Sequence, residues 1–254
     1  MSSLTSLFSE RSQKAILWWG IGLAIAYSIA LIFLLHMVPP PSATWSIDHV
    51  AAWYSEHRTS ILIGATINGW TGAFMMPILA VLAVQMARVE GGRYPIWSWL
   101  SLVSGAVMSI WLALPPFLWG AAAFTPARDH SATEALHTLG MFTLTTSDQF
   151  YIFLWIGVSV ICLRPATQLV PHNPFPRWWG YLSLWITVMF EAGAFAYLTR
   201  TGPFAWNGLL VFWSPLSLFG VWIFIQCRLL FKSLSAQMDA KRVGSEDPVT
   251  VGAF

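Results

Sequence analysis

Six long apolar runs, separated by short polar segments, dominate the hydropathy pattern of the chain. Each run is long enough for the ~20 residues that a helix needs to cross a bilayer. The predicted spans lie near residues 15–37, 59–86, 95–122, 142–163, 178–199 and 205–231. The pattern therefore predicts an all-α polytopic membrane protein with six transmembrane helices.

Lys and Arg residues are distributed unevenly between the two sets of connections. Ten of the 13 lie on alternate connections, counted from the amino terminus: Arg11, Lys14, Arg88, Arg93, Arg164, Arg177, Arg228, Lys232, Lys241 and Arg242. The other set holds only Arg58, Arg128 and Arg200. Because basic residues accumulate in cytoplasmic loops, we expect a multi-pass protein of the cell inner membrane with both termini in the cytoplasm.

Two of the connections assigned to the outer side predict short helices of their own. Apolar residues recur at helical spacing from Trp45 to Arg58, where Ser46 offers an N-cap, and again from Ser131 to Leu139. Such short amphipathic helices lie along a membrane surface rather than cross it. We therefore expect two interfacial helices on the outer side.

One membrane domain is predicted, and it covers residues 1–233. The apolar run from Ala15 to Val38 exceeds the ~7–15 residues of a cleavable signal sequence, so we expect it to remain as the first span. The residues that follow, 234–254, are polar. We predict that they form a disordered cytoplasmic tail.

Composition agrees with a membrane location and argues against several classes of function. Hydrophobic residues make up 56% and charged residues 9% of the chain, whereas soluble domains contain about 25% charged residues. No basic stretch is interleaved with aromatic residues, so we expect no nucleic-acid partner. The sequence has no nucleophile elbow, Walker loop or dinucleotide-binding glycine pattern. The expected partners are the lipid bilayer, a hydrophobic small molecule, and other membrane subunits or a second copy of the chain.

Three polar side chains interrupt the predicted spans, namely Asn68, Asp148 and Glu191. An ionisable residue inside a span is costly and is by default a candidate for function. From the helical rise, Asn68 and Glu191 lie roughly 12–14 Å, and Asp148 roughly 8–9 Å, from the outer ends of their spans. We therefore predict one polar cavity open to the outer face, with Glu191 and Asp148 as catalytic acid–base candidates.

Asn68 is a candidate to bind a ligand. Three nearby polar residues are candidates to bind the same ligand, namely Thr71, Gln149 and Thr187. A structural role is the alternative. Glu191 would then be a protonated or hydrogen-bonded clamp between helices, and Asp148 a helix cap near the interface.

Five of the six histidines fall on the side assigned as outer. His130, Glu134 and His137 share one helical stripe at positions i, i+4 and i+7, a spacing that can hold a divalent metal. A single imidazole such as that of His57 can bind a haem iron. The alternative is that these histidines are solvated side chains of interfacial helices, since the chain has no HExxH motif.

The chain resembles an uncharacterised family of bacterial six-span membrane proteins in the segments TGPFAWNGLL (201–210), Phe212-Trp213, Ala52-Trp53-Tyr54 and His57-Arg58. This resemblance covers most of the chain and implies the six-span fold without an activity. A looser similarity links it to styrene oxide isomerase, a haem membrane enzyme in which a histidine binds haem and a following asparagine contacts the epoxide. By analogy His57 and Asn68 would take these roles, but they stand farther apart here than in that family.

Three functions are compatible with these observations. The first is a non-enzymatic membrane protein that binds a hydrophobic small molecule or serves as an accessory subunit of a membrane complex. The second is a membrane enzyme of the isomerase or oxidoreductase type that acts on a lipophilic substrate, either with haem or a metal or with Glu191 or Asp148 alone as acid–base. The third is a proton-coupled carrier centred on Glu191. We favour the first, because the chain has few catalytic groups.

Overall fold

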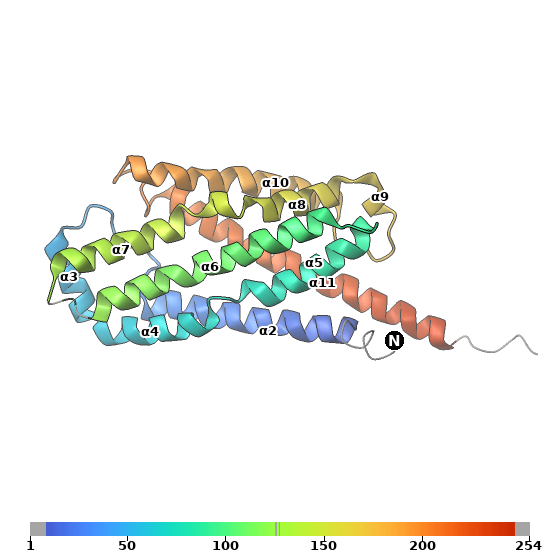
Figure 1. Cartoon of the computed structure of the whole chain (residues 1–254), viewed down its shortest axis with the longest axis horizontal. Helices are drawn as coiled ribbons and strands as arrows, with labels where there is room; N and C mark the ends of the chain where they lie inside the picture. Colours follow the sequence, from blue (N-terminus) through green and yellow to red (C-terminus); the bar gives the residue numbers. More distant parts are fainter. Residues whose placement is uncertain (1–8, 125, 127, 247–254) are drawn as a thin grey trace, which may run out of the picture.

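The computed structural model describes residues 9–124, 126 and 128–246 of the chain. Within these residues the fold is all-α, and the helices lie along one common long direction (Figure 1). In chain order the elements are α2 (Glu10–Ile29), the π-helical turn η1 (Ala30–Leu34), α3 (Ile47–Glu56), α4 (Arg58–Thr71), α5 (Met75–Glu90), α6 (Ile96–Phe124), α7 (His130–Thr145), the 3-10 turn η2 (Asp148–Phe150), α8 (Ile152–Leu163), α9 (Pro165–Gln168), α10 (Arg177–Phe190), the 3-10 helix η3 (Glu191–Leu198), the π-helical turn η4 (Leu209–Trp213) and α11 (Ser214–Glu246).

Five helical stretches in the described part of the chain are long and apolar enough to cross a membrane. They are Glu10–Leu34, Arg58–Glu90, Ile96–Phe124, Arg177–Leu198 and Leu209–Val243. Each coincides with one of the predicted spans, so the all-α membrane-type fold is confirmed at this level.

The remaining predicted span, 142–163, is not one helix. It is divided between the end of α7 and the 12-residue apolar helix α8, with η2 between them. Thr145 and Thr146 bond through their side-chain hydroxyls to the carbonyls of Met141 and Phe142. Such bonds compete with the helical backbone pattern and commonly bend or end a helix.

The connections alternate between the two ends of the bundle. Figure 1 shows the start of α2, the α5–α6 turn, α9 and the end of α11 toward one end, and α3 at the other. The connections that carry most of the Lys and Arg residues therefore share one end, as the charge distribution requires of a membrane bundle.

The two predicted interfacial helices have different outcomes. Helix α3 forms as a short element, and Ser46 caps it by accepting a hydrogen bond from the His49 backbone N–H at 3.3 Å. The stretch 131–139, in contrast, is not a separate short helix but the first half of α7, which packs along α6. Gly140 permits this contact, because a side chain there would clash with the indole of Trp119.

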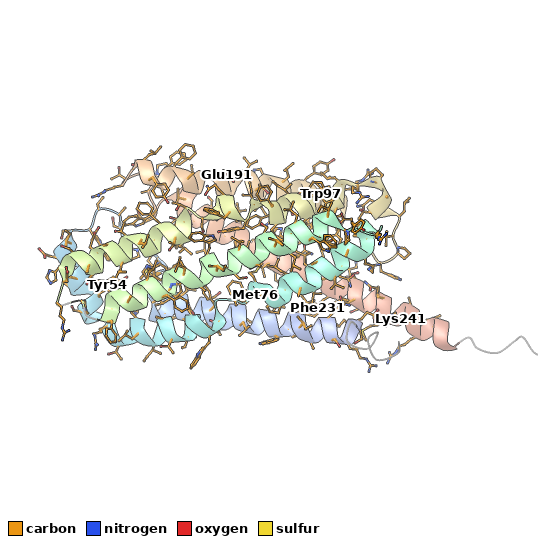
Figure 2. The ribbon with its side chains drawn as sticks, in the orientation of Figure 1. Tyr54, Met76, Trp97, Glu191, Phe231 and Lys241 are labelled. Carbon is orange, nitrogen blue, oxygen red and sulfur yellow. The ribbon has the colours of Figure 1, made fainter. Side chains whose placement is uncertain are left out.

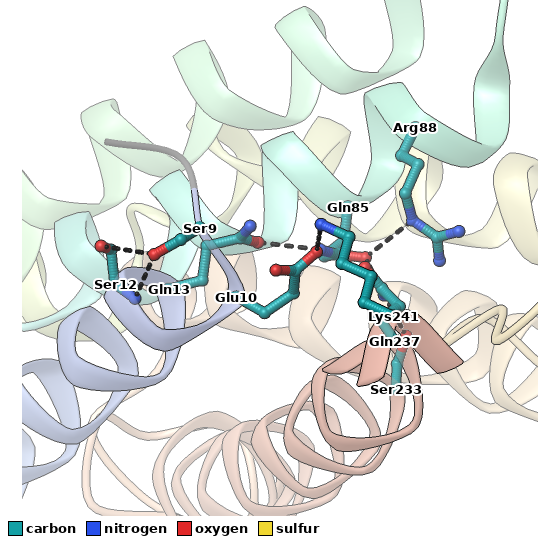
Figure 3. Close-up of polar contacts among 9 residues, drawn as sticks. All are labelled: Ser9, Glu10, Ser12, Gln13, Gln85, Arg88, Ser233, Gln237 and Lys241. Atoms are coloured by element: carbon teal, nitrogen blue, oxygen red, sulfur yellow. Dashed lines mark hydrogen bonds and ion pairs between the residues drawn. The ribbon is translucent and has the colours of Figure 1, made fainter. Parts of the chain in front are cut away.

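The prediction of a disordered tail from residue 234 is wrong as far as Glu246, because α11 continues without a break to that residue. Polar contacts hold this part of α11 against the neighbouring helices (Figure 3). Gln237 donates to Gln85 Oε1 at 3.0 Å, and Lys241 pairs with Glu10. Residues 247–254 lie outside the described part.

Large aromatic side chains fill the centre of the bundle, where Trp155, Trp179 and Trp222 are fully buried. A buried indole N–H needs an acceptor. Trp179 donates to Gln226 Oε1 at 2.7 Å, and Trp222 donates to Ser183 Oγ at 3.2 Å. These bonds join α10 to α11.

Gly72 provides a test of this packing, because it lies where α4 passes into α5 and contacts α6. A Cβ atom at Gly72 would lie 2.9 Å from Cα and Cβ of Ala113 and 2.8 Å from the Asn68 carbonyl oxygen. Since backbone atoms cannot move aside cheaply, we expect Gly72→Ala to lower the free energy of unfolding by about 1–3 kcal/mol. Thermal unfolding in detergent measures the effect. Gly22→Ala is the control, because a Cβ there has no neighbour within 4 Å, and equal midpoints for both variants would contradict the expectation.

Candidate functional site

Three interruptions of regular α-helix meet inside the bundle. The 3-10 helix η3, which continues α10, packs against both η2 and η4. The contact with the end of α7 is so close that a Cβ at Gly193 would clash with the Thr145 carbonyl oxygen. Non-α backbone at membrane depth is tolerated only where it is buried in protein or lines a cavity. This junction is therefore a candidate functional site.

Two acidic residues stand at the junction, one on each broken helix. Asp148 opens η2 and is 5% exposed, and its Oδ1 accepts a hydrogen bond from the Tyr151 hydroxyl. Glu191 opens η3 and lies near enough to interact electrostatically with Asp148. Figure 2 shows Glu191 on the helical stretch that continues α10, at a different level of the bundle from Tyr54.

Two polar atoms at the junction are buried without a hydrogen-bond partner in the described part of the chain. They are Oε1 of Glu191 and Nε2 of Gln149, the residue after Asp148. A buried polar atom without a partner costs free energy. The junction is thus able to accept a proton, a water molecule or a polar group of a ligand.

An apolar cavity of about 170 Å³ lies beside the junction, between α2, α6, α7 and α11. Aliphatic and aromatic side chains form most of its wall. The polar part of the wall consists of Tyr27, Ser28, Thr145, Asp148 and Tyr151. Tyr27 donates to the Leu112 carbonyl at 2.8 Å, so its hydroxyl is fixed. Asp148 therefore belongs both to the junction and to the cavity.

The single polar cavity predicted from depth does not form around all of its expected members. Asn68, Thr71, Thr187 and Glu191 are not among the residues that line the apolar cavity. Asn68 is fully buried on α4. Its Oδ1 lies 3.5 Å from the Thr71 hydroxyl, and its Nδ2 has no hydrogen-bond partner among the described residues. Thr187 donates to the Ser183 carbonyl within α10. The structure pairs Asp148 with Glu191 and leaves Asn68 elsewhere.

The histidines considered as metal or haem ligands lie apart and have different partners. His130 Nδ1 lies 2.9 Å from Asp48 Oδ1, and His137 Nδ1 lies 3.0 Å from the Tyr54 hydroxyl. Glu134 accepts a hydrogen bond from Thr138. No group of three or more His, Cys, Asp or Glu residues that could hold a metal occurs in the part of the chain that the structure describes. The side chains of His130, Glu134 and His137 therefore do not form a metal site in the described part of the chain.

His57 forms the junction between α3 and α4, and its Nδ1 lies 3.0 Å from the Trp53 carbonyl oxygen. Its ring packs against that of His36, with 4.7 Å between the centroids. Both rings line a second hollow of about 310 Å³ together with Trp53. His57 and Asn68 do not line a common cavity within the described residues.

Sequence reasoning missed the tyrosines of these sites. Tyr151 follows Asp148 by three residues, a separation that brings side chains together on helical backbone, so the local spacing could have indicated it. Tyr54 lies 83 residues from His137 and no local pattern connects them. Tyr27 likewise reaches its site from a different helix.

Comparison of the chain with models of protein families, with curated proteins and with solved structures gave no match. The resemblances noted in the sequence therefore stay predictions, and function has to be argued from the sites themselves.

Tyr151→Phe tests whether the Tyr151–Asp148 bond stabilises the junction. Removal of the hydroxyl leaves the buried Asp148 without this donor, so we expect a loss of about 1–3 kcal/mol in the free energy of unfolding. Asp148→Asn is the matched variant, because its amide oxygen still accepts from Tyr151, and it should unfold near the wild-type midpoint. If denaturant titration gives Tyr151→Phe the wild-type stability, the bond has no such role.

Proposed function

We propose that the chain is an integral membrane protein with six spans that binds a hydrophobic small molecule in the apolar cavity. The span predicted at residues 142–163 would be formed by the end of α7, η2 and α8 in series, and η3 packs against η2. The common end of the basic connections supports cytoplasmic termini and a location in the cell inner membrane.

The observation that carries the binding proposal is the composition of the cavity wall. Apolar side chains from α2, α6 and α11 surround it, and the polar groups of Thr145, Asp148 and Tyr151 stand together along η2 and the end of α7. A pocket of this kind binds the apolar body of a ligand and orients it through a few polar groups. Apolar cavities of about 150 Å³ accept a benzene-sized molecule. The cavity therefore suits one ring or a short alkyl chain with a single hydroxyl or carbonyl.

Photolabelling tests this site with a defined probe, a hexanol that carries a diazirine. We expect the label to concentrate on α11 residues of the wall, such as Leu216 and Phe219, and excess unlabelled hexanol to suppress it. Gly220→Trp should remove most of this labelling, because Gly220 lines the cavity and a Cβ there meets nothing within 4 Å. Peptide mapping by mass spectrometry provides the measurement.

Gly22→Trp is the matched control, since Gly22 is also open at Cβ but does not line the cavity. Label that spreads over the exposed surface, without competition and equally in both variants, would rule out the proposed site. Labelling of the wall that excess hexanol cannot suppress would also argue against specific binding.

A proton-coupled carrier is the second candidate, favoured by the two carboxyl groups at the junction. Acidic residues on interrupted helices are characteristic of sites that take up and release protons or ions within membranes. Asp148 opens η2 and Glu191 opens η3, and the side-chain Oε1 of Glu191 has no partner in the described part. The pair thus meets the local requirement for proton transfer.

Glu191→Gln distinguishes a carrier from a structural clamp. In liposomes loaded with a pH-sensitive dye, a carrier should lose proton flux in this variant while its unfolding temperature stays near that of the wild type. Thr199→Val, at the far end of η3, is the control that should keep the flux. The absence of flux from the wild-type protein, or full flux in Glu191→Gln, would eliminate a carrier centred on this residue.

A further inference from the structure

A separate polar cavity lies at the α3 end of the bundle, the end at which Figure 2 labels Tyr54. Its volume is about 290 Å³, and it is lined by residues of α3, α7 and η3, of the segment before α3 and of the segment after η3. The wall includes Trp45, Glu134, His137, Arg200 and Trp206. It shares no lining residue with the apolar cavity, so its role does not depend on the function proposed above.

His137 supplies a hydrogen-bond donor without a protein partner. The side chain is 1% exposed, its Nδ1 lies 3.0 Å from the Tyr54 hydroxyl, and its Nε2 has no partner among the described residues. Tyr54 is fully buried and makes no other side-chain hydrogen bond in that part of the chain. Its O–H must therefore donate to Nδ1, because the alternative leaves a buried hydroxyl hydrogen unpaired.

This bond fixes the tautomer of His137. When Nδ1 accepts from Tyr54, the ring proton resides on Nε2, which becomes an N–H donor. His137 lines the cavity and Tyr54 does not. An N–H at this position recognises an acceptor oxygen, and it cannot ligate a metal while it keeps its proton.

The cavity also contains one side chain of each charge. Glu134 accepts a hydrogen bond from Thr138 Oγ1 at 3.0 Å, which orients its carboxylate, and Arg200 lies at the exposed rim. Neither takes part in an ion pair with another described residue. A ligand with a single charge would be attracted by either Glu134 or Arg200 and repelled by the other. A ligand that carries one positive and one negative group can pair with Glu134 and Arg200 at the same time.

Two tryptophans complete the wall. The Trp206 indole N–H donates to the Pro41 carbonyl at 2.9 Å, and the ring packs edge-on against Phe142 with 5.4 Å between the centroids. Trp45 is held by contacts with His49 and Trp53. Indole faces attract organic ammonium groups, so the aromatic part of the wall favours the same cation as Glu134.

From this combination we propose that the cavity binds a small zwitterion, in which an oxyanion and an ammonium group are carried by one molecule. The oxyanion accepts from His137 Nε2–H and Arg200, and the ammonium group lies by Glu134 and the tryptophans. Phosphoethanolamine has this chemistry, either as a free molecule or as the headgroup of a phospholipid.

Calorimetric titration of the full chain in a nonionic detergent tests the proposal with three probes. These are O-phosphoethanolamine, dihexanoyl-phosphatidylethanolamine and inorganic phosphate. We expect Arg200→Gln and His137→Gln to raise the Kd for both zwitterions roughly tenfold, as expected for a lost hydrogen bond to a charged group. Glu134→Gln should weaken the zwitterions but not inorganic phosphate, because only the zwitterions carry a cation.

Arg128→Gln is the control, since Arg128 is exposed near the start of α7 but does not line the cavity. Binding of both zwitterions with this variant pattern supports the site and shows that the headgroup suffices, whereas binding of the phospholipid alone supports it and identifies a lipid as the source. No saturable binding of either zwitterion, or equal affinities in wild type, Arg200→Gln and Glu134→Gln, overturns it. The last two variants alter side chains at or near the surface, so this outcome does not depend on whether His137→Gln folds.

Discussion

The need to pair every backbone N–H and C=O inside the protein governs how a membrane chain can depart from the α-helix. Lipid offers no hydrogen bonds, so irregular backbone must be covered by other parts of the chain. Here η3 packs against both η2 and η4. The carboxyl groups of Asp148 and Glu191 lie at the starts of two of these segments. The polar junction is thus a consequence of gathering the helix interruptions in one place.

Close helix contacts make this arrangement possible. A Cβ at Gly193 would clash with the Thr145 carbonyl, and one at Gly180 would lie 2.6 Å from Cys162 Cβ. Because lipid tails are as apolar as the side chains, helices in a bilayer associate through packing and hydrogen bonds rather than through hydrophobic burial. Glycine at these contacts brings α10 and η3 close enough to α8 and α7 for the two acidic residues to interact.

The sequence predicted the helices well where hydropathy alone decides the structure. It failed where polar side chains act locally or through distant partners. The span 142–163 reads as continuous because its average hydropathy is high, and an average does not detect that Thr145 and Thr146 bond to the backbone. The polar composition of residues 234–254 predicts a disordered tail, but Gln237 and Lys241 form contacts with residues on α5 and at the start of α2.

The candidate sites were predictable only in part for a related reason. Depth within a span can be counted along one helix, and this count predicts similar levels for Asp148 and Glu191. It does not specify which helices are adjacent, so Asn68 was grouped with them although α4 packs against α2 and α6. The pairing of Tyr54 with His137 depends on the contact between α3 and α7, which hydropathy cannot reveal.

Helix α7 contributes to both cavities, because His137 lines the polar cavity and Thr145 lines the apolar one. Tyr197 of η3 also lines the polar cavity, and its ring stacks on Phe142 of α7 with 4.7 Å between the centroids. The Tyr197 hydroxyl lies 2.8 Å from Oγ1 of Thr146, the residue after Thr145. Both cavities therefore depend on the contact between α7 and η3, which is one of the contacts that the helix interruptions create.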